Sequence, residues 1–191
     1  ETFPPGADQN HQRWLETISQ FDGAVCISKA VADDLRAWQD AAGFKCENRR
    51  PLSIGWFHLG ADVASSAPSR GLPKNAEATL QKLKAFPSFL MVGTIEPRKG
   101  YLQTFEAFEQ LWREGAEVHL VIVGHEGWKS LTEEMRRDIP QTVERLRTHP
   151  ELNKRLFWLE GITDEYLEKI YAASNCLIAA SYGEGFGLPL I

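Results

Sequence analysis

Residues 89–124 read FLMVGTIEPRKGYLQTFEAFEQLWREGAEVHLVIVG, and this stretch decides the fold class. It opens with an apolar run, 89–92, that ends at Gly93, and closes with a second run, 118–123, that ends at Gly124. Between the two runs, apolar residues recur at helical spacing and predict an amphipathic helix. A strand, a helix and a second strand of these lengths form the unit from which parallel sheets are built.

The same alternation continues toward the C-terminus. Strands are predicted over 156–159 and 176–180, and helices over 164–173 and 129–149, the last broken or kinked at Pro140. The sequence therefore predicts an α/β fold, a Rossmann-like parallel sheet with helices on both faces. The strands run into glycine-containing turns at one rim of the sheet, which is where ligands bind in such folds.

Toward the N-terminus, apolar spacing predicts a helix over 8–20, strands over 24–27 and 51–57, and a helix capped by Ser28. The tryptophans of this part, such as Trp14, fall at positions typical of a core.

Glycine, proline and serine are frequent over 58–75, which indicates a linker, and a short helix is predicted over about 76–85. We predict three parts: residues 1–60 form the tail of one Rossmann-like domain, residues 61–85 a linker, and residues 86–191 a second domain that binds the ligand.

Composition narrows the function classes. The chain has 191 residues, 43% of them hydrophobic and 25% charged, and a net charge of −5, which argues against a nucleic-acid partner. Cys26, Cys46 and Cys176 form no CxxC pair, so neither a zinc site nor a disulfide framework is indicated. Cys26 and Cys176 lie in apolar runs and are expected to be buried. We expect a cytoplasmic protein that needs no metal.

The first motif with chemical content is Gly93-Thr94-Ile95-Glu96-Pro97-Arg98-Lys99-Gly100. Arg98 and Lys99 stand between the end of a strand and the start of a helix, whose free N–H groups favour anions. The pair could bind a diphosphate, or could be cations on a solvated turn. The spacing fits neither a P-loop nor a GxGxxG fingerprint.

Two further turns follow strands. Gly124-His125-Glu126-Gly127 is most simply a strand-to-helix turn that uses glycines. The loop Glu160-Gly161-Ile162-Thr163-Asp164 could present its backbone and Ile162 to a planar base, or could serve only as a helix cap through Thr163.

The most unusual stretch is Ser181-Tyr182-Gly183-Glu184-Gly185-Phe186-Gly187-Leu188-Pro189-Leu190-Ile191. A carboxylate in a glycine-rich turn after a strand can accept hydrogen bonds from ligand hydroxyls while neighbouring amides hold oxygen atoms. The alternative is a surface turn. We favour the binding function because so many glycines are costly to order.

These motifs, in this order, resemble the nucleotide-sugar-binding domain of retaining glycosyltransferases of family four, which have the GT-B fold. The resemblance rests on VGTIEPRKG at 92–100, VIVG at 121–124, FWLEG at 157–161 and SYGEGFGLPLI at 181–191. Upstream, FDGAVCISK at 21–29 looks like the last part of the family's acceptor-side domain. IGWFHLGAD at 54–62 looks like the crossover into the donor domain.

The resemblance implies a nucleoside diphosphate sugar as donor and no cofactor. Lys99, with Arg98, would neutralise the diphosphate leaving group. Glu184 matches the first glutamate of the family's E-x7-E motif and would contact the transferred sugar. The other implied nucleotide-sugar contacts are Gly93, Thr94, Gly124, Gly161, Ile162, Asp164, Gly185, Phe186, Gly187 and Leu188.

Three departures from the family pattern bear on activity. Thr94 stands where the family often has arginine, and Arg98 is expected to take that role. The second glutamate of the motif would follow Ile191, and the acceptor domain's histidine and glycine loop would precede Glu1. We therefore expect a fragment that is inactive alone.

The implied activity is transfer of a hexose to a glycan or lipid-linked acceptor with retention of anomeric configuration. The Glu-Pro-Arg-Lys run resembles bacterial mannosyltransferases of surface polysaccharide assembly, which favours GDP-mannose over a UDP-sugar. Lipid-linked acceptors are common in the family, so peripheral contact of the full-length protein with the inner face of the plasma membrane is plausible. Two alternatives remain open: a sugar-nucleotide epimerase with the GT-B fold, and a non-catalytic nucleotide-binding module.

Overall fold

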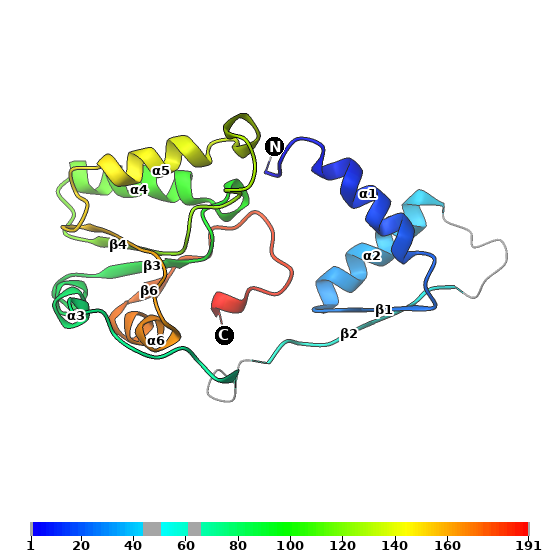
Figure 1. Ribbon diagram of the computed structural model, residues 1–191, viewed down its shortest axis with the longest axis horizontal. Coiled ribbons are helices and arrows are strands. Elements are labelled where there is room, and N and C mark those ends of the chain that lie inside the picture. The colour runs from blue at the N-terminus through cyan, green and yellow to red at the C-terminus, as the bar shows by residue number, and fades with distance from the viewer. Residues whose placement is uncertain (1, 44–50, 61–65, 191) are drawn as a thin grey trace. The chain divides into compact units, whose positions relative to one another are not determined.

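The computed structural model describes residues 2–43, 51–60 and 66–190 (Figure 1). Contacts divide the chain into two compact units. The larger unit consists mainly of Asp62–Gly183, and the smaller consists mainly of Phe3–Ala61 together with Glu184–Pro189.

A four-stranded parallel sheet forms the centre of the larger unit, with strand order β5-β4-β3-β6. The strands are β3 (Ser88–Val92), β4 (His119–Val123), β5 (Leu156–Leu159) and β6 (Cys176–Leu177). Val92 pairs with Val123, and Val123 pairs with Leu159, so β3, β4 and β5 end level with one another. Their carboxyl ends therefore share one edge of the sheet, as predicted.

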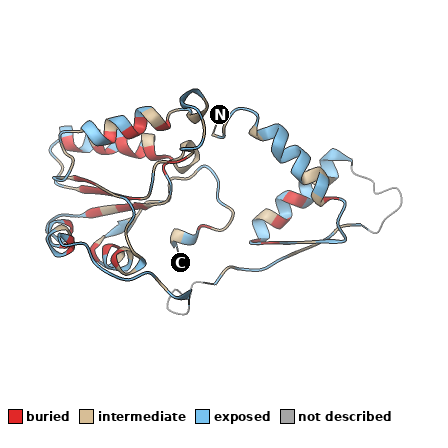
Figure 2. Ribbon diagram, in the orientation of Figure 1, coloured by how far each residue is buried: buried red, intermediate tan, exposed pale blue. Residues whose placement is uncertain are grey.

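Helices cover both faces of this sheet (Figure 1). α4 (Tyr101–Arg113) and α5 (Ile139–Thr148) pack on one face, and α3 (Ala76–Ala85) and α6 (Asp164–Ala173) pack on the other. Alternate residues of β4 point to opposite faces. Accordingly, Leu120 and Ile122 belong to the core beneath α4 and α5, whereas Val121 and Val123 belong to the other core. Figure 2 shows the buried residues along the strands and on the inner sides of the helices.

The smaller unit contains two helices and a two-stranded parallel sheet. Its elements are α1 (Ala7–Ile18), β1 (Gly23–Cys26), α2 (Lys29–Ala42) and β2 (Ser53–Trp56). The Ser28 hydroxyl caps α2 by accepting from Val31 N–H at 3.2 Å, as predicted. Among its described residues, Cys26, Ala32 and Leu35 are buried in one core cluster.

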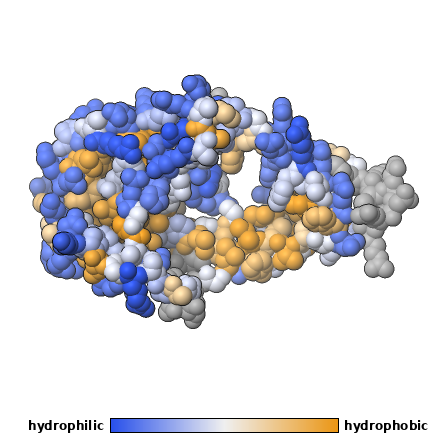
Figure 3. Space-filling view, in the orientation of Figure 1, coloured by the Kyte–Doolittle hydropathy of each residue, from blue (hydrophilic) through white to orange (hydrophobic). Residues whose placement is uncertain are grey.

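Apolar side chains gather on the exposed surface over this two-stranded sheet (Figure 3). Val25 is 70% exposed and Trp56 44% exposed. Trp14, on α1, is 57% exposed, so the prediction of a core position was wrong for Trp14 and Trp56.

Two other predictions need correction. Residues 129–149 do not form one kinked helix: they form a 3-10 turn, Glu133–Arg136, and then α5, which has Pro140 in its first turn. Proline suits that position because its fixed φ favours the helix and no hydrogen-bonded N–H is lost. Cys176 is exposed, because β6 is a short strand at the edge of the sheet. Cys26 is buried as expected, and Cys46 lies outside the described residues.

The predicted linker, 61–85, is also too long. Residues 61–65 lie outside the described residues, but residues 76–85 form α3, whose Ala76, Leu80 and Leu83 are buried in the core of the larger unit. The helix is therefore part of the packed unit. None of the helices in the described ranges is both long and apolar enough to span a membrane.

Candidate functional site

Two glycines define the edge of the sheet at which β3 and β4 end. Gly93 has φ 144° and Gly124 has φ 155°, values that side-chain-bearing residues rarely adopt. A Cβ placed on Gly124 would lie 1.8 Å from the carbonyl oxygen of Gly93. Gly93 N–H donates to Val123 O at 2.9 Å, and Gly124 N–H donates to Leu159 O at 3.1 Å. The glycines thus let the two turns leave the sheet in close contact.

Lys99 lies over the first of these turns. It ends a 3-10 turn, Pro97–Lys99, and Gly100 then begins α4 with φ 70°. A Cβ on Gly93 would be 3.6 Å from Lys99 Cε and 3.7 Å from Nζ, so the ammonium group borders the space that a side chain at Gly93 would take. Tyr101 Oη donates to Gly93 O at 2.5 Å and fixes the same turn from the helix side. A cation therefore stands at the carboxyl end of a central strand, next to a helix N-terminus.

Arg98 takes a different direction. Its Nε donates to Glu96 Oε2 at 3.1 Å, and its Nη1 donates to the carbonyl oxygen of Gly183 at 3.3 Å. Thr94, where the family often has arginine, is exposed. The guanidinium of Arg98 is thus engaged with other parts of the larger unit.

The turn after β4 is held against the turn after β3. Ile95 N–H donates to His125 O at 2.8 Å, and Gly127 N–H donates to Ile95 O at 3.1 Å. Glu126 is 12% exposed and forms ion pairs with Arg136 and, at 3.5 Å, with Arg147. These ion pairs were missed in the sequence, because the two arginines come from residues beyond the turn. The turn after β4 thus supports the loop that carries Lys99.

A cavity of about 530 Å³ opens where β5 ends, and its lining includes Gly161, Ile162, Asn75 and Tyr166. Gly161 has φ 63°. The predicted base-contacting loop therefore borders a real cavity.

Asp164 holds the chain that leads into α3. Its Oδ2 accepts hydrogen bonds from the Ser69 hydroxyl at 2.7 Å and the Ser69 N–H at 2.8 Å, and these bonds lower the pKa of the Asp164 carboxyl. Thr163 caps α6, as predicted, by accepting from Tyr166 N–H at 3.2 Å. Asp164 therefore holds the segment that comes just before Gly71, which lines the cavity.

The segment Glu184–Pro189 packs with the smaller unit. Gly187 is buried with φ 85°, and a Cβ on Gly185 would lie 3.0 Å from Ile27 Cδ1. The Phe186 ring lies 5.7 Å from the ring of His58. Glu184 and Leu188 are exposed.

The structure thus groups the predicted site residues in three sets. Gly93, Lys99 and Gly124 meet at one edge of the sheet, Gly161 and Ile162 border the cavity at the end of β5, and Gly185, Phe186 and Gly187 are ordered within the smaller unit. Within residues 2–43, 51–60 and 66–190, no three His, Cys, Asp or Glu side chains gather as metal ligands would.

Several curated relatives are named mannosyltransferases. The chain is 48% identical over 193 residues to serotype-specific mannosyltransferase WbdA of Escherichia coli, a match that covers 97% of this chain and 22% of that protein. It is 30% identical over 137 residues to O-antigen chain mannosyltransferase B of Escherichia coli, covering 69% of this chain and 31% of the relative. The chain therefore spans about a fifth to a third of the relatives it matches.

Solved structures share the fold at low identity. A UDP-forming α,α-trehalose-phosphate synthase from Burkholderia xenovorans matches with a TM-score of 0.65 and 15% identity, over 98% of this chain and 47% of that one. The catalytic domain of starch synthase IV from Arabidopsis thaliana, bound to ADP and acarbose, matches with a TM-score of 0.55 and 17% identity, over 91% of this chain and 38% of that one. The α/β architecture predicted from the sequence is confirmed.

The family expected from the four motifs is confirmed as well. A family model described as glycosyl transferases group 1 matches residues 75–191, more than half of the chain, and includes the turns at Gly93, Gly124, Gly161 and Gly185. The chain belongs to the group 1 glycosyl transferases.

Proposed function

We propose that this chain contributes the nucleotide-sugar site of a mannosyltransferase, which takes mannose from GDP-mannose and transfers it to a glycan or lipid-linked acceptor with retention. A UDP-sugar is the alternative donor. The observation that carries the proposal is the position of Lys99 over Gly93, at the carboxyl end of β3. The 48% identity to a protein named mannosyltransferase WbdA supports the choice of sugar.

The chemistry explains why a cation is needed there. When the bond between the anomeric carbon and the diphosphate oxygen breaks, negative charge grows on the departing diphosphate and positive charge on the sugar ring. The Lys99 ammonium would stabilise that negative charge without a metal ion. α4 begins directly after Lys99, so the free N–H groups of its first turn add to the positive potential.

The cavity at the end of β5 would hold the base. Its volume of about 530 Å³ lies within the range of small-molecule pockets. Gly161 offers backbone groups without a side chain, and Ile162 offers an apolar surface for one face of a ring. Asp164 would act indirectly here, by holding Ser69, two residues before Gly71 in the cavity lining.

Glu184 would accept hydrogen bonds from the mannose hydroxyls, and the amides of 185–188 would bind sugar and phosphate oxygens. We also propose that the full-length protein acts on the cytoplasmic side of the membrane. Contact with the membrane, if its acceptor is lipid-linked, would be peripheral.

Calorimetric titration tests the donor site. GDP, GDP-mannose, UDP and ADP are each titrated into the chain and into Lys99→Ala. GDP and GDP-mannose are expected to bind best, and Lys99→Ala to weaken both by about tenfold or more, as for a lost charge-assisted hydrogen bond. Lys84→Ala is the matched control, because this exposed lysine lies in the last turn of α3, before β3 begins.

The possible outcomes separate the parts of the proposal. If GDP and GDP-mannose bind equally well to wild type and to Lys99→Ala, Lys99 does not contact the donor. Tighter binding of UDP than of GDP would leave the donor site in place and change the base. Failure of every nucleotide to bind would count against the proposed function itself.

A further inference from the structure

Arg98 and Lys99 are adjacent in sequence, but they serve different neighbours. They belong to a 3-10 turn, in which successive side chains point about 120° apart, since three residues complete one turn. Lys99 lies over Gly93, whereas Arg98 donates to Glu96 and to the carbonyl oxygen of Gly183. The different neighbours of the two cations indicate different functions.

The loop that carries Arg98 is bonded to segment 180–183 at several points. Tyr182 N–H donates to Arg98 O at 2.8 Å, so the backbones of the two segments are bonded directly. Gln103 Nε2 donates to Tyr182 Oη at 2.8 Å. A Cβ on Gly100 would lie 2.5 Å from Ala180 O, so only glycine allows this approach. The Arg98 side chain adds the last of these bonds, at Gly183.

Glu96 fixes the direction of the guanidinium. The Glu96 side chain is 18% exposed and that of Arg98 is 27% exposed, so the pair is shielded from most of the solvent. Guanidinium presents donors in a rigid planar fork, which suits one group that bridges a carboxylate and a carbonyl. The donors of lysine all lie on one nitrogen at the end of a flexible stem, so lysine lacks this spaced, planar arrangement.

We infer that Arg98, oriented by Glu96, is a positioning residue that holds the backbone at Gly183 and so fixes the start of the turn that carries Glu184, while Lys99 meets the diphosphate. This inference rests on the proposed function for its consequence in binding. Its structural part concerns the unliganded chain and can be tested without any nucleotide. It predicts that Arg98 matters for the sugar part of the donor more than for the diphosphate.

Hydrogen exchange of the unliganded chain is the first test. In Arg98→Ala, the amides of 181–187 are expected to exchange roughly tenfold faster, because a charge-assisted bond that restrains this segment is lost. Arg98→Lys is expected to fail to restore the slow exchange. Arg113→Ala, at an exposed arginine of α4, should leave these amides unchanged. Unchanged exchange in Arg98→Ala would overturn the inference whatever the ligand proves to be.

Binding gives the second test. Arg98→Ala is expected to weaken GDP by less than about twofold and GDP-mannose by about tenfold, whereas Lys99→Ala weakens both. Equal losses for the two ligands in Arg98→Ala would make Arg98 a diphosphate ligand and overturn the inference.

The Glu96→Gln variant distinguishes a positioning role of Arg98 from diphosphate binding, because the two roles predict opposite changes in affinity. If Arg98 positions Gly183, neutralising Glu96 loosens 181–187 and weakens GDP-mannose. If Arg98 binds the diphosphate, removing a competing carboxylate tightens GDP instead, and that result would overturn the inference. One further outcome would refute only this inference. If GDP binds and Lys99→Ala weakens it as expected, but the Arg98 and Glu96 variants bind both ligands like wild type, the proposed function still stands.

Discussion

At Gly124 the backbone leaves no room for any side chain. A Cβ would lie 1.8 Å from Gly93 O, and the neighbour is main chain that belongs to the adjacent strand's turn. The φ of 155° adds backbone strain for any other residue. Gly124→Ala is therefore expected to lower the free energy of unfolding by about 2–3 kcal/mol, measured by urea denaturation followed by circular dichroism.

Gly183→Ala is the control for that measurement. A Cβ on Gly183 would meet nothing within 4 Å, so its free energy of unfolding should change little. If Gly124→Ala were as stable as Gly183→Ala, the close approach of the two turns would be refuted.

The sequence predicted part of this detail and not the rest. Glycine after each strand indicated a turn at the sheet edge, and Lys99 beside a helix start indicated an anion site. The contact between Gly93 and Gly124 depends on the strand register, which apolar periodicity does not fix. The engagement of Arg98 with Gly183 joins residues 85 positions apart, so no local pattern could have shown it.

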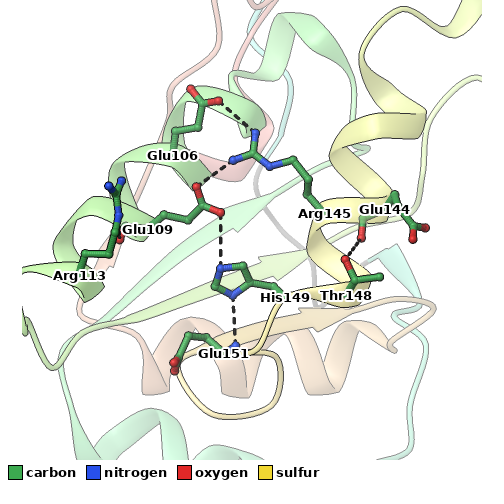
Figure 4. A network of polar contacts seen from close by, with 8 residues as sticks. All are labelled: Glu106, Glu109, Arg113, Glu144, Arg145, Thr148, His149 and Glu151. Carbon is green, nitrogen blue, oxygen red and sulfur yellow. Dashed lines mark hydrogen bonds and ion pairs between the residues drawn. The ribbon is translucent and has the colours of Figure 1, made fainter.

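Between α4 and α5, a polar network crosses the helix interface (Figure 4). Arg145 donates to Glu106 at 3.1 Å and to Glu109 at 2.8 Å, and its guanidinium carbon lies 5.3 Å from the centroid of the Phe105 ring. His149 Nε2 lies 3.5 Å from Glu109, and its Nδ1 accepts from the main-chain N–H of Glu151 at 3.2 Å. The network ties the end of α5 to α4.

Arg145→Met keeps most of the side-chain volume and removes the charge. Its side chain is 31% exposed, so solvent screens part of the attraction, and we expect a loss of about 1 kcal/mol of unfolding free energy. The loss should shrink in high salt, because the ion pairs are partly screened. Arg113→Met, on the exposed side of α4, is the matched control. If both variants lose the same unfolding free energy, or if the loss in Arg145→Met does not depend on salt, the ion pairs of the network do not stabilise the fold.

At this scale the sequence predicted most elements but misjudged some ends. The apolar period located β3, β4, β5 and α4, because each buries a regular set of side chains. It extended a helix across Pro140, where the proline instead stands in the first turn of a new helix. It also predicted the helix over 76–85 but grouped it with the linker, whereas α3 packs into the core of the larger unit.

The whole chain consists of two units whose cores differ greatly in size. The larger unit has a buried cluster on each face of its sheet, whereas in the described part of the smaller unit the buried cluster consists of Cys26, Ala32 and Leu35. Burial of apolar surface is the main favourable term in folding, and a small core leaves a small margin over conformational entropy. The smaller unit should therefore be the less stable one.

We expect the two units to unfold in separate transitions, with the smaller unit unfolding at lower denaturant concentration. Leu35→Ala should destabilise the first transition by about 2–4 kcal/mol and leave the second in place, and Leu120→Ala should do the reverse. Hydrogen exchange with mass spectrometry resolves the two, because peptides from β1 and β2 report on one unit and peptides from β4 on the other. The peptide that covers Glu184–Pro189 should follow Leu35→Ala, since this segment packs with the smaller unit. A single transition that both substitutions shift equally would mean that the two units fold as one cooperative body.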